Sequence, residues 1–145
     1  MPYWDTSALI QLYVAENDSA YFLKLVSETD EPIVSASIAT TEVLCVLHRK
    51  EHLGGLKAGS ARRLFRKFGA DVRSGRILLI SYGREVEEQA EKLLGLTFAQ
   101  PRTILIRSLD LIHVSSALVS RAECMVATDG RLRALAVRAG LRVLP

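Results

Sequence analysis

Short apolar runs alternate along the whole chain with longer stretches in which apolar residues recur at helical spacing. The runs have the length of buried strands, and the stretches between them have the length of helices. Strands that alternate with helices in this way form a parallel sheet that is covered by helices on both faces. The pattern therefore predicts an α/β fold with a central parallel sheet of about five strands.

The expected strands and helices follow directly from this pattern. We predict strands at residues 3–5, 32–35, 76–81, 124–128 and 141–144, and helices at residues 7–15, 19–28, 36–51, 57–74, 83–94, 108–121 and 130–139. Gly54 and Gly55 are expected to end the third helix, and Gly140 the last one. In the segment LTFAQPRTILIR, Pro101 ends any helix, and TILI fits either a strand or the lead-in to the next helix.

A chain of 145 residues has the size of one domain and can bury a core without disulfides. We therefore predict a single domain over residues 1–145. No apolar run approaches the roughly 18–20 residues that a membrane span needs, and no signal peptide is visible, so we expect a cytoplasmic protein without a membrane partner. Cys45 and Cys124 lie far apart, without a CxxC motif, and are assigned no chemistry.

Positive charge is concentrated in one part of the chain. The formal net charge is only +3, but residues 57–76 carry seven cations and one anion, Asp71. Such a stretch can neutralise the phosphates of a nucleic acid, although a solvated helix face has the same composition. The side chains that we single out as phosphate-binding candidates are Arg62, Arg63, Arg66 and Lys67.

Four acids stand in apolar surroundings. Asp5 and Asp129 each follow an apolar run that is predicted to be a strand. Glu42 and Asp110 lie in predicted helices, and their neighbours at helical spacing, such as Val46 for Glu42, are apolar. Any one of these acids alone fits a helix cap or a paired, half-buried carboxylate. All four together are better explained by a shared site.

A buried carboxylate must be protonated, paired with a cation or bound to a metal ion. Apart from Arg107, Arg49 and Lys50, few cations lie near the four acids in sequence. Mg²⁺ and Mn²⁺ prefer oxygen ligands of this kind. The hydroxyls of three neighbouring residues can support such ligands or cap helices: Thr6, Ser7 and Thr128.

Topology can bring these acids together. Ligands of open parallel sheets bind at the carboxyl ends of the strands, where the strand order reverses. If the first strand and the Cys124 strand are neighbours across that reversal, Asp5 and Asp129 face each other. Glu42 and Asp110 then lean in from the flanking helices.

Four segments resemble, in order and spacing, the PIN-domain ribonucleases, and in particular the VapC-type toxins of toxin–antitoxin pairs. They are DTSALIQLYVAE, SIATTEVLCVLHR, IRSLDLIHVSSAL and VATDGRLRALAVRAGLRVL, and they extend over essentially the whole chain. The resemblance implies a three-layer α/β/α domain with an acidic pocket that binds Mg²⁺ or Mn²⁺. It also implies cleavage of single-stranded or loop RNA, often tRNA or rRNA.

Residue by residue, the resemblance makes Asp5, Glu42, Asp110 and Asp129 the catalytic acids, with Glu42 reaching the metal directly or through water. Thr6 or Ser7 matches the hydroxyl that follows the first acid. Many members carry Thr or Ser two residues before the fourth acid, where this chain has Ala127, followed by Thr128. His113 is interpreted as a packing or hydrogen-bonding residue. A VapB-like antitoxin, an RNA substrate and a homodimer are the implied partners.

The expected reaction is metal-assisted hydrolysis of a phosphodiester, with Glu42 orienting or deprotonating the attacking water. The basic stretch at residues 57–76 would hold the RNA backbone.

One alternative is an aspartate-based phosphotransfer module, either a receiver domain or a dehalogenase-like enzyme. Against the dehalogenase, Ser7 stands where such enzymes have a second acid, and against the receiver, no acid pair lies near the first strand. The other alternative is an inactive module that binds RNA or a partner without cleavage.

Overall fold

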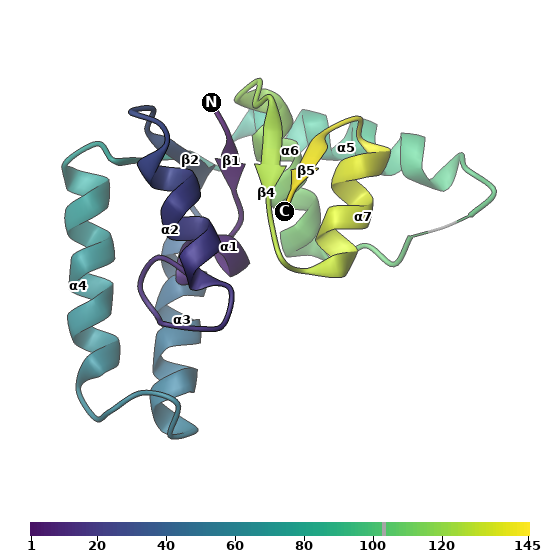
Figure 1. Ribbon diagram of the computed structural model, residues 1–145. Helices are drawn as coiled ribbons and strands as arrows, with labels where there is room; N and C mark the ends of the chain where they lie inside the picture. The colour runs from purple at the N-terminus through teal and green to yellow at the C-terminus, as the bar shows by residue number, and fades with distance from the viewer. Residues whose placement is uncertain (103) are drawn as a thin grey trace.

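Five parallel strands form one sheet in the computed structural model, which describes residues 1–102 and 104–145 (Figure 1). The strands stand in the order β3-β2-β1-β4-β5, and every neighbouring pair is parallel. Their bounds are β1 Tyr3–Trp4, β2 Ile33–Ala36, β3 Ile77–Ile80, β4 Cys124–Val126 and β5 Arg142–Leu144. The first half of the chain therefore winds outward from β1 in one direction, and the second half in the other.

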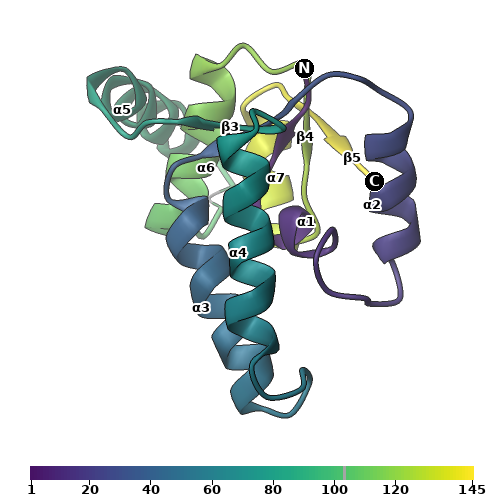
Figure 2. The same cartoon turned by 90° about the vertical axis from the view of Figure 1, so that its left-hand side faces the viewer.

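Helices connect the strands and cover both faces of the sheet (Figures 1 and 2). Their bounds are α1 Thr6–Ile10, α2 Ser19–Ser27, α3 Ala39–His52, α4 Ser60–Arg73, α5 Arg84–Phe98, α6 Ser108–Val119 and α7 Gly130–Arg138. None of the helices in the described part of the chain combines the length and the apolar character that crossing a bilayer requires. The three-layer α/β/α architecture agrees with the sequence-based prediction.

Alternating side chains along the strands divide the interior into two cores. Trp4 joins the core that α1, α2, α3 and α4 cover, whereas Tyr3 joins the core that α5, α6 and α7 cover. Val126 and Met125 divide in the same way. Both faces of the central strands are buried, which is why these strands read as continuous apolar runs in the sequence.

The predicted elements are confirmed, and their bounds shift by a few residues. The first helix ends at Ile10, earlier than expected, and Ala36 belongs to β2 instead of α3. Gly54 and Gly140 follow their helices with φ angles of 82° and 86°, a left-handed conformation that favours glycine. Residues 104–107 form neither a strand nor a helix, and Thr103, part of the ambiguous TILI segment, lies outside the described residues.

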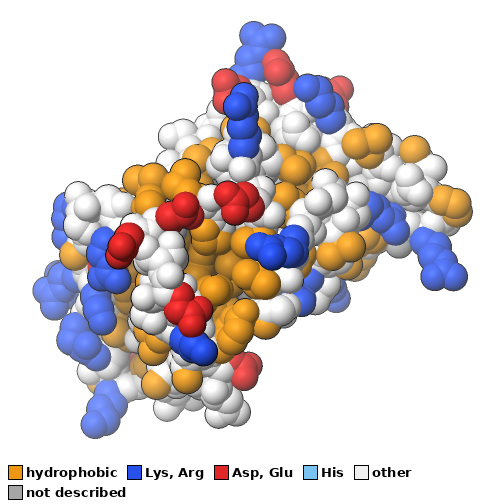
Figure 3. Space-filling view, turned by 45° about the horizontal axis from the view of Figure 1, so that its top comes forward, with side chains coloured by type: hydrophobic (Ala, Val, Ile, Leu, Met, Phe, Trp, Pro, Cys, Tyr) orange, Lys and Arg blue, Asp and Glu red, His pale blue; other side chains and the backbone are white. Residues whose placement is uncertain are grey.

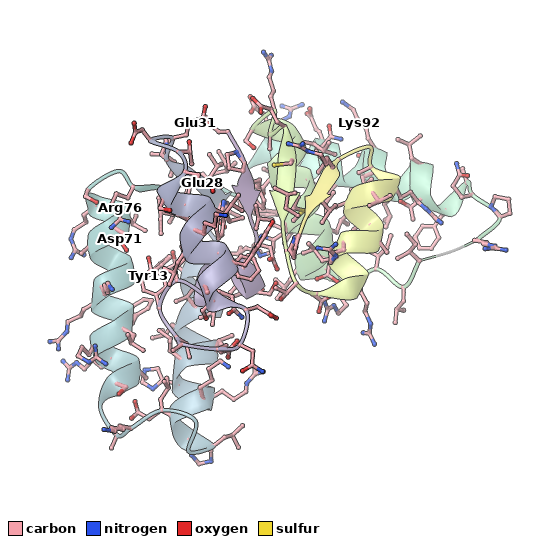
Figure 4. The ribbon with its side chains drawn as sticks, in the orientation of Figure 1. Tyr13, Glu28, Glu31, Asp71, Arg76 and Lys92 are labelled. Carbon is pink, nitrogen blue, oxygen red and sulfur yellow. The ribbon has the colours of Figure 1, made fainter. Side chains whose placement is uncertain are left out.

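A polar contact ties α4 to the rest of the molecule. The hydroxyl of Tyr13 donates a hydrogen bond of 2.7 Å to Asp71, and Arg76 donates one of 3.1 Å to the other oxygen of the same carboxylate. The three side chains meet at the end of α4 (Figure 4). This contact accounts for the single anion in the basic stretch, because Asp71 binds within the protein.

Candidate metal centre

The four acids line one pocket, at the point where the strand order reverses. Asp5 follows β1 and Asp129 follows β4, and these two strands are neighbours. Glu42 lies in the first turn of α3, and Asp110 in the first turn of α6. The pocket has a volume of about 570 Å³, and Thr6, Ser7 and Thr128 are also among its lining residues. The structure thus meets the condition under which the sequence analysis expects Asp5 and Asp129 to face each other, because the two strands are neighbours.

Asp5 is held by hydrogen bonds at the start of α1. Its carboxylate accepts bonds from the backbone N–H of Ser7 and Ala8, both at 3.2 Å, and from the Ser7 hydroxyl at 2.8 Å. The Ser7 hydroxyl also accepts a bond of 2.9 Å from the backbone N–H of Thr128, which ties the end of β1 to the end of β4. Asp5 is only 4% exposed, and this burial raises the pKa of its carboxyl group. Within the described part of the chain, no Lys or Arg forms an ion pair with it.

Glu42 is at the end of a chain of hydrogen bonds that begins at the buried Tyr3 and becomes partly buried at Glu42 itself. The hydroxyl of Tyr3 lies 2.8 Å from Nδ1 of His113, and Nε2 of His113 lies 2.6 Å from Oε2 of Glu42. Thr6 donates a further bond of 2.5 Å to the same oxygen. Burial favours a higher pKa for Glu42, but the bonds from His113 and Thr6 outweigh it and leave the pKa below its usual value.

The tautomer of His113 follows from its neighbours. Burial raises the pKa of Tyr3 well above its usual value, so the phenol keeps its proton and can donate it to Nδ1. With Nδ1 as the acceptor, the imidazole carries its proton on Nε2, and this N–H points at Glu42. His113 is therefore a hydrogen-bonding residue, as expected from the sequence, and it fixes the orientation of Glu42.

Arg107 joins the two remaining acids. Its Nε and one terminal nitrogen, Nη2, donate bonds of 2.6 and 2.9 Å to the two oxygens of Asp110. The same Nη2 lies 3.0 Å from Oδ2 of Asp129. Hydrogen bonds to the two carboxylates raise the pKa of Arg107. Burial favours a higher pKa for Asp129, but bonds from backbone N–H groups and from Arg107 outweigh it and lower the pKa.

The structure brings together all seven predicted residues of the acidic site. The sequence did not reveal two features of this pocket, the bridge that Arg107 forms and the part that Tyr3 plays. The spacing of three residues between Arg107 and Asp110 was a usable signal for the first contact. The contact between Arg107 and Asp129 had no local signal, because it depends on how α6 packs beside the end of β4.

The predicted phosphate-binding cations lie elsewhere. Figure 3 shows Lys and Arg side chains along the left edge of the molecule, over α4. The four candidates on this helix, Arg62, Arg63, Arg66 and Lys67, are exposed. The pocket, as far as its described lining goes, takes its cations from other elements, namely Arg49 and Lys50 at the end of α3 and Arg107 before α6.

The donor set fits a hard divalent cation. All the candidate ligands are carboxylate oxygens, and a positive group, the guanidinium of Arg107, already lies between two of them. In residues 1–102 and 104–145, however, no three His, Cys, Asp or Glu side chains lie close enough together to hold a metal ion as they stand. The acids therefore share a pocket without forming a preassembled coordination shell.

Comparisons with known proteins agree with this fold. Residues 3–138 match the PIN domain family, and the chain belongs to that family. A solved structure of VapBC2 from Rickettsia felis, bound to a DNA fragment from its promoter, contains a chain of similar fold. The likeness covers 99% of this chain and 98% of that one, with a TM-score of 0.68 and 15% sequence identity, a level that speaks for the fold alone. Comparison with curated proteins gave no match.

Proposed function

We propose that this protein is a divalent-metal-dependent endoribonuclease and the toxin of a VapBC-type toxin–antitoxin pair. The observation that carries the proposal is the convergence of Asp5, Glu42, Asp110 and Asp129 on one pocket at the switch point of a PIN-domain sheet. Membership of this family removes the receiver and dehalogenase-like alternatives. The VapBC2 structure supports the more specific assignment as a toxin through its fold.

Asp5, Asp110 and Asp129 would hold Mg²⁺ or Mn²⁺, with Glu42 binding directly or through water. A divalent ion in this pocket would polarise the phosphate and make a water molecule more acidic. Ser7 keeps the Asp5 carboxylate in place, and Thr6 does the same for Glu42. Thr128 contributes its backbone N–H to the Ser7 hydroxyl.

Glu42 would orient the attacking water or accept its proton. Both hydrogen bonds from Thr6 and His113 go to Oε2. Within the described residues, Oε1 has no protein partner and can accept a hydrogen bond from water. The lowered pKa keeps the carboxylate ionised at neutral pH, as either task requires.

The RNA would meet positive charge at two distances from the reacting phosphate. Arg49, at the end of α3, lines the pocket and can contact the backbone close to it. The basic face of α4 can contact the RNA farther away through Arg62, Arg63, Arg66 and Lys67. A VapB-like antitoxin and a homodimer remain predictions of the same proposal.

The proposal can be tested by cleavage of end-labelled total tRNA and of a single-stranded RNA. Purified protein is incubated with Mg²⁺, Mn²⁺ or EDTA, alongside Asp5→Asn and Asp110→Asn, with the exposed Asp30→Asn as a matched control. We expect cutting that needs the metal, is lost in the two pocket variants and survives in the control. RNA binding without cutting, by protein free of antitoxin, would instead favour the inactive binding module.

A further inference from the structure

The carboxylate oxygens of Asp110 and Asp129 are already occupied. Both oxygens of Asp110 accept bonds from Arg107. Oδ1 of Asp129 accepts the backbone N–H groups of Arg131 and Leu132 at 2.9 and 3.2 Å, and Oδ2 faces Arg107. Each of the four oxygens therefore has a donor or a cation beside it. A metal ion that is to bind both acids must compete with the guanidinium.

Arg107 is the member of this group that can move. Its side chain is 45% exposed, whereas the side chain of Asp110 is 8% exposed. Arg107 has extended backbone angles at the residue before α6, and residues 104–107 lie outside the helices and strands. Asp110 lies within α6, and Asp129 caps α7 through its side chain. The guanidinium can therefore swing into solvent while both acids keep their places.

We propose that Arg107 is an exchangeable counter-ion, which neutralises Asp110 and Asp129 in the metal-free protein and is displaced when a divalent ion binds. This inference rests on the proposed function, because it assumes that these acids are metal ligands. The bridge stabilises the acid pair while no ion is present, and for the same reason it lowers the apparent affinity for the ion. Arg107 thereby sets the metal concentration at which the site fills.

Direct measurement of metal affinity tests this exchange. Mn²⁺ binding to the purified full chain is followed by electron paramagnetic resonance for the wild type, Arg107→Gln and Arg84→Gln. Arg84 is the matched control, since it is an exposed arginine paired with a carboxylate, Glu88, on α5. Arg107→Gln should bind Mn²⁺ about 10-fold more tightly than the wild type, because a competing state no longer has to be displaced. Arg84→Gln should bind like the wild type.

The outcomes separate this inference from the proposed function. Equal or weaker Mn²⁺ binding by Arg107→Gln, with clear binding by the wild type, overturns the exchange and leaves the metal-dependent function standing. A site that fails to bind Mn²⁺ in any of the proteins overturns both. Thermal unfolding adds a second readout. The melting temperature of metal-free Arg107→Gln should fall below that of the metal-free wild type. Mn²⁺ should raise the melting temperature of the variant by more than it raises that of the wild type.

A second measurement uses only the wild-type protein and so does not depend on whether a variant folds. The Nε–H signal of Arg107 in wild-type protein can be followed by ¹H–¹⁵N NMR during titration with Mg²⁺. The signal should start at a position typical of a guanidinium bound to carboxylate and move to that of a solvated arginine as the site fills. A signal that keeps its bound position at saturating Mg²⁺ overturns the exchange.

Discussion

Asp5 is the least compensated charge in the pocket. Its partners are backbone N–H groups and the hydroxyl of Ser7, and burial raises its pKa above the ordinary value of 3.8. A carboxylate with a raised pKa in the folded state binds protons more readily there than in the unfolded chain. Its contribution to stability is therefore present at low pH and is lost as the pH rises from about 3.8 through the folded-state pKa.

This environment predicts how Asp5→Asn behaves. Asparagine caps a helix about as well as aspartate and cannot ionise, so the variant should be more stable than the wild type at neutral pH without metal. This difference in stability between the variant and the wild type should shrink as the pH falls towards 3.8. The rate of RNA cleavage should fall by more than about 100-fold. Urea unfolding in EDTA at a series of pH values measures the first effect. A variant that is less stable at pH 7 would show that Asp5 carries no uncompensated charge.

The hydrogen bonds from Tyr3 to His113 and from His113 to Glu42 predict a second effect. Tyr3→Phe removes the hydroxyl from Nδ1, so the imidazole loses its fixed tautomer and Glu42 its fixed donor. We expect the rate of cleavage to fall about 10-fold, as for other residues that orient catalytic groups, with little change in the KM for RNA. Stability should fall by about 1 kcal/mol. An unchanged rate in a folded variant would mean that Glu42 is oriented without Tyr3.

Individual residues differ in how well the sequence predicted them. The four acids could be recognised because a charged side chain among apolar neighbours is unusual wherever it occurs. The role of Tyr3 could not, because a tyrosine in a buried strand looks like any other core residue until His113 is placed beside it. The bridge from Arg107 to Asp129 could not be recognised from the sequence either, because it joins segments that meet only in the fold.

The basic face of α4 predicts how RNA binding depends on salt. Replacing Arg62, Arg63, Arg66 and Lys67 together by Ala should weaken RNA binding. It should also reduce the slope of log affinity against log salt by about 0.7 for each RNA phosphate that the variant no longer neutralises. The rate of cleavage of bound RNA should stay the same, because none of these side chains is among the described lining of the pocket. Fluorescence anisotropy at several salt concentrations measures the slope.

Lys92 provides the control for this experiment. It is exposed on α5, on the opposite side of the molecule from α4 (Figure 4). Lys92→Ala should leave both the affinity and the salt slope close to those of the wild type. If the quadruple variant behaves like Lys92→Ala, then α4 does not contact RNA and its charges form a solvated helix face.

Helices and strands were predictable because their periodicity is local. The buried residues Ala61, Leu64 and Phe68 of α4 alternate with exposed cations, as an amphipathic helix requires. The early end of α1 was not predictable from periodicity, because apolar residues continue past Ile10 into a turn whose side chains are also packed. Packing against the core keeps that turn apolar without making it helical.

The whole molecule is organised around the reversal between β1 and β4. Two buried cores hold the two halves of the sheet together, and the acids converge where the halves meet. From the sequence, the meeting of Asp5 and Asp129 depended on the condition that their two strands are neighbours, and the strand order of the fold meets that condition. The distances within the pocket could not be predicted from the sequence, because they depend on the fold. The same holds for the finding that no three potential ligands converge among the described residues.

The most direct test of this account is a crystal structure of the protein grown with Mn²⁺, with anomalous scattering recorded at the manganese edge. We predict an anomalous peak bonded to carboxylate oxygens of Asp5, Asp110 and Asp129, with the guanidinium of Arg107 turned away from both of its present partners. An anomalous peak outside this pocket would contradict the account. So would crystals saturated with Mn²⁺ that show full density for the Arg107 bridge and no anomalous peak beside it.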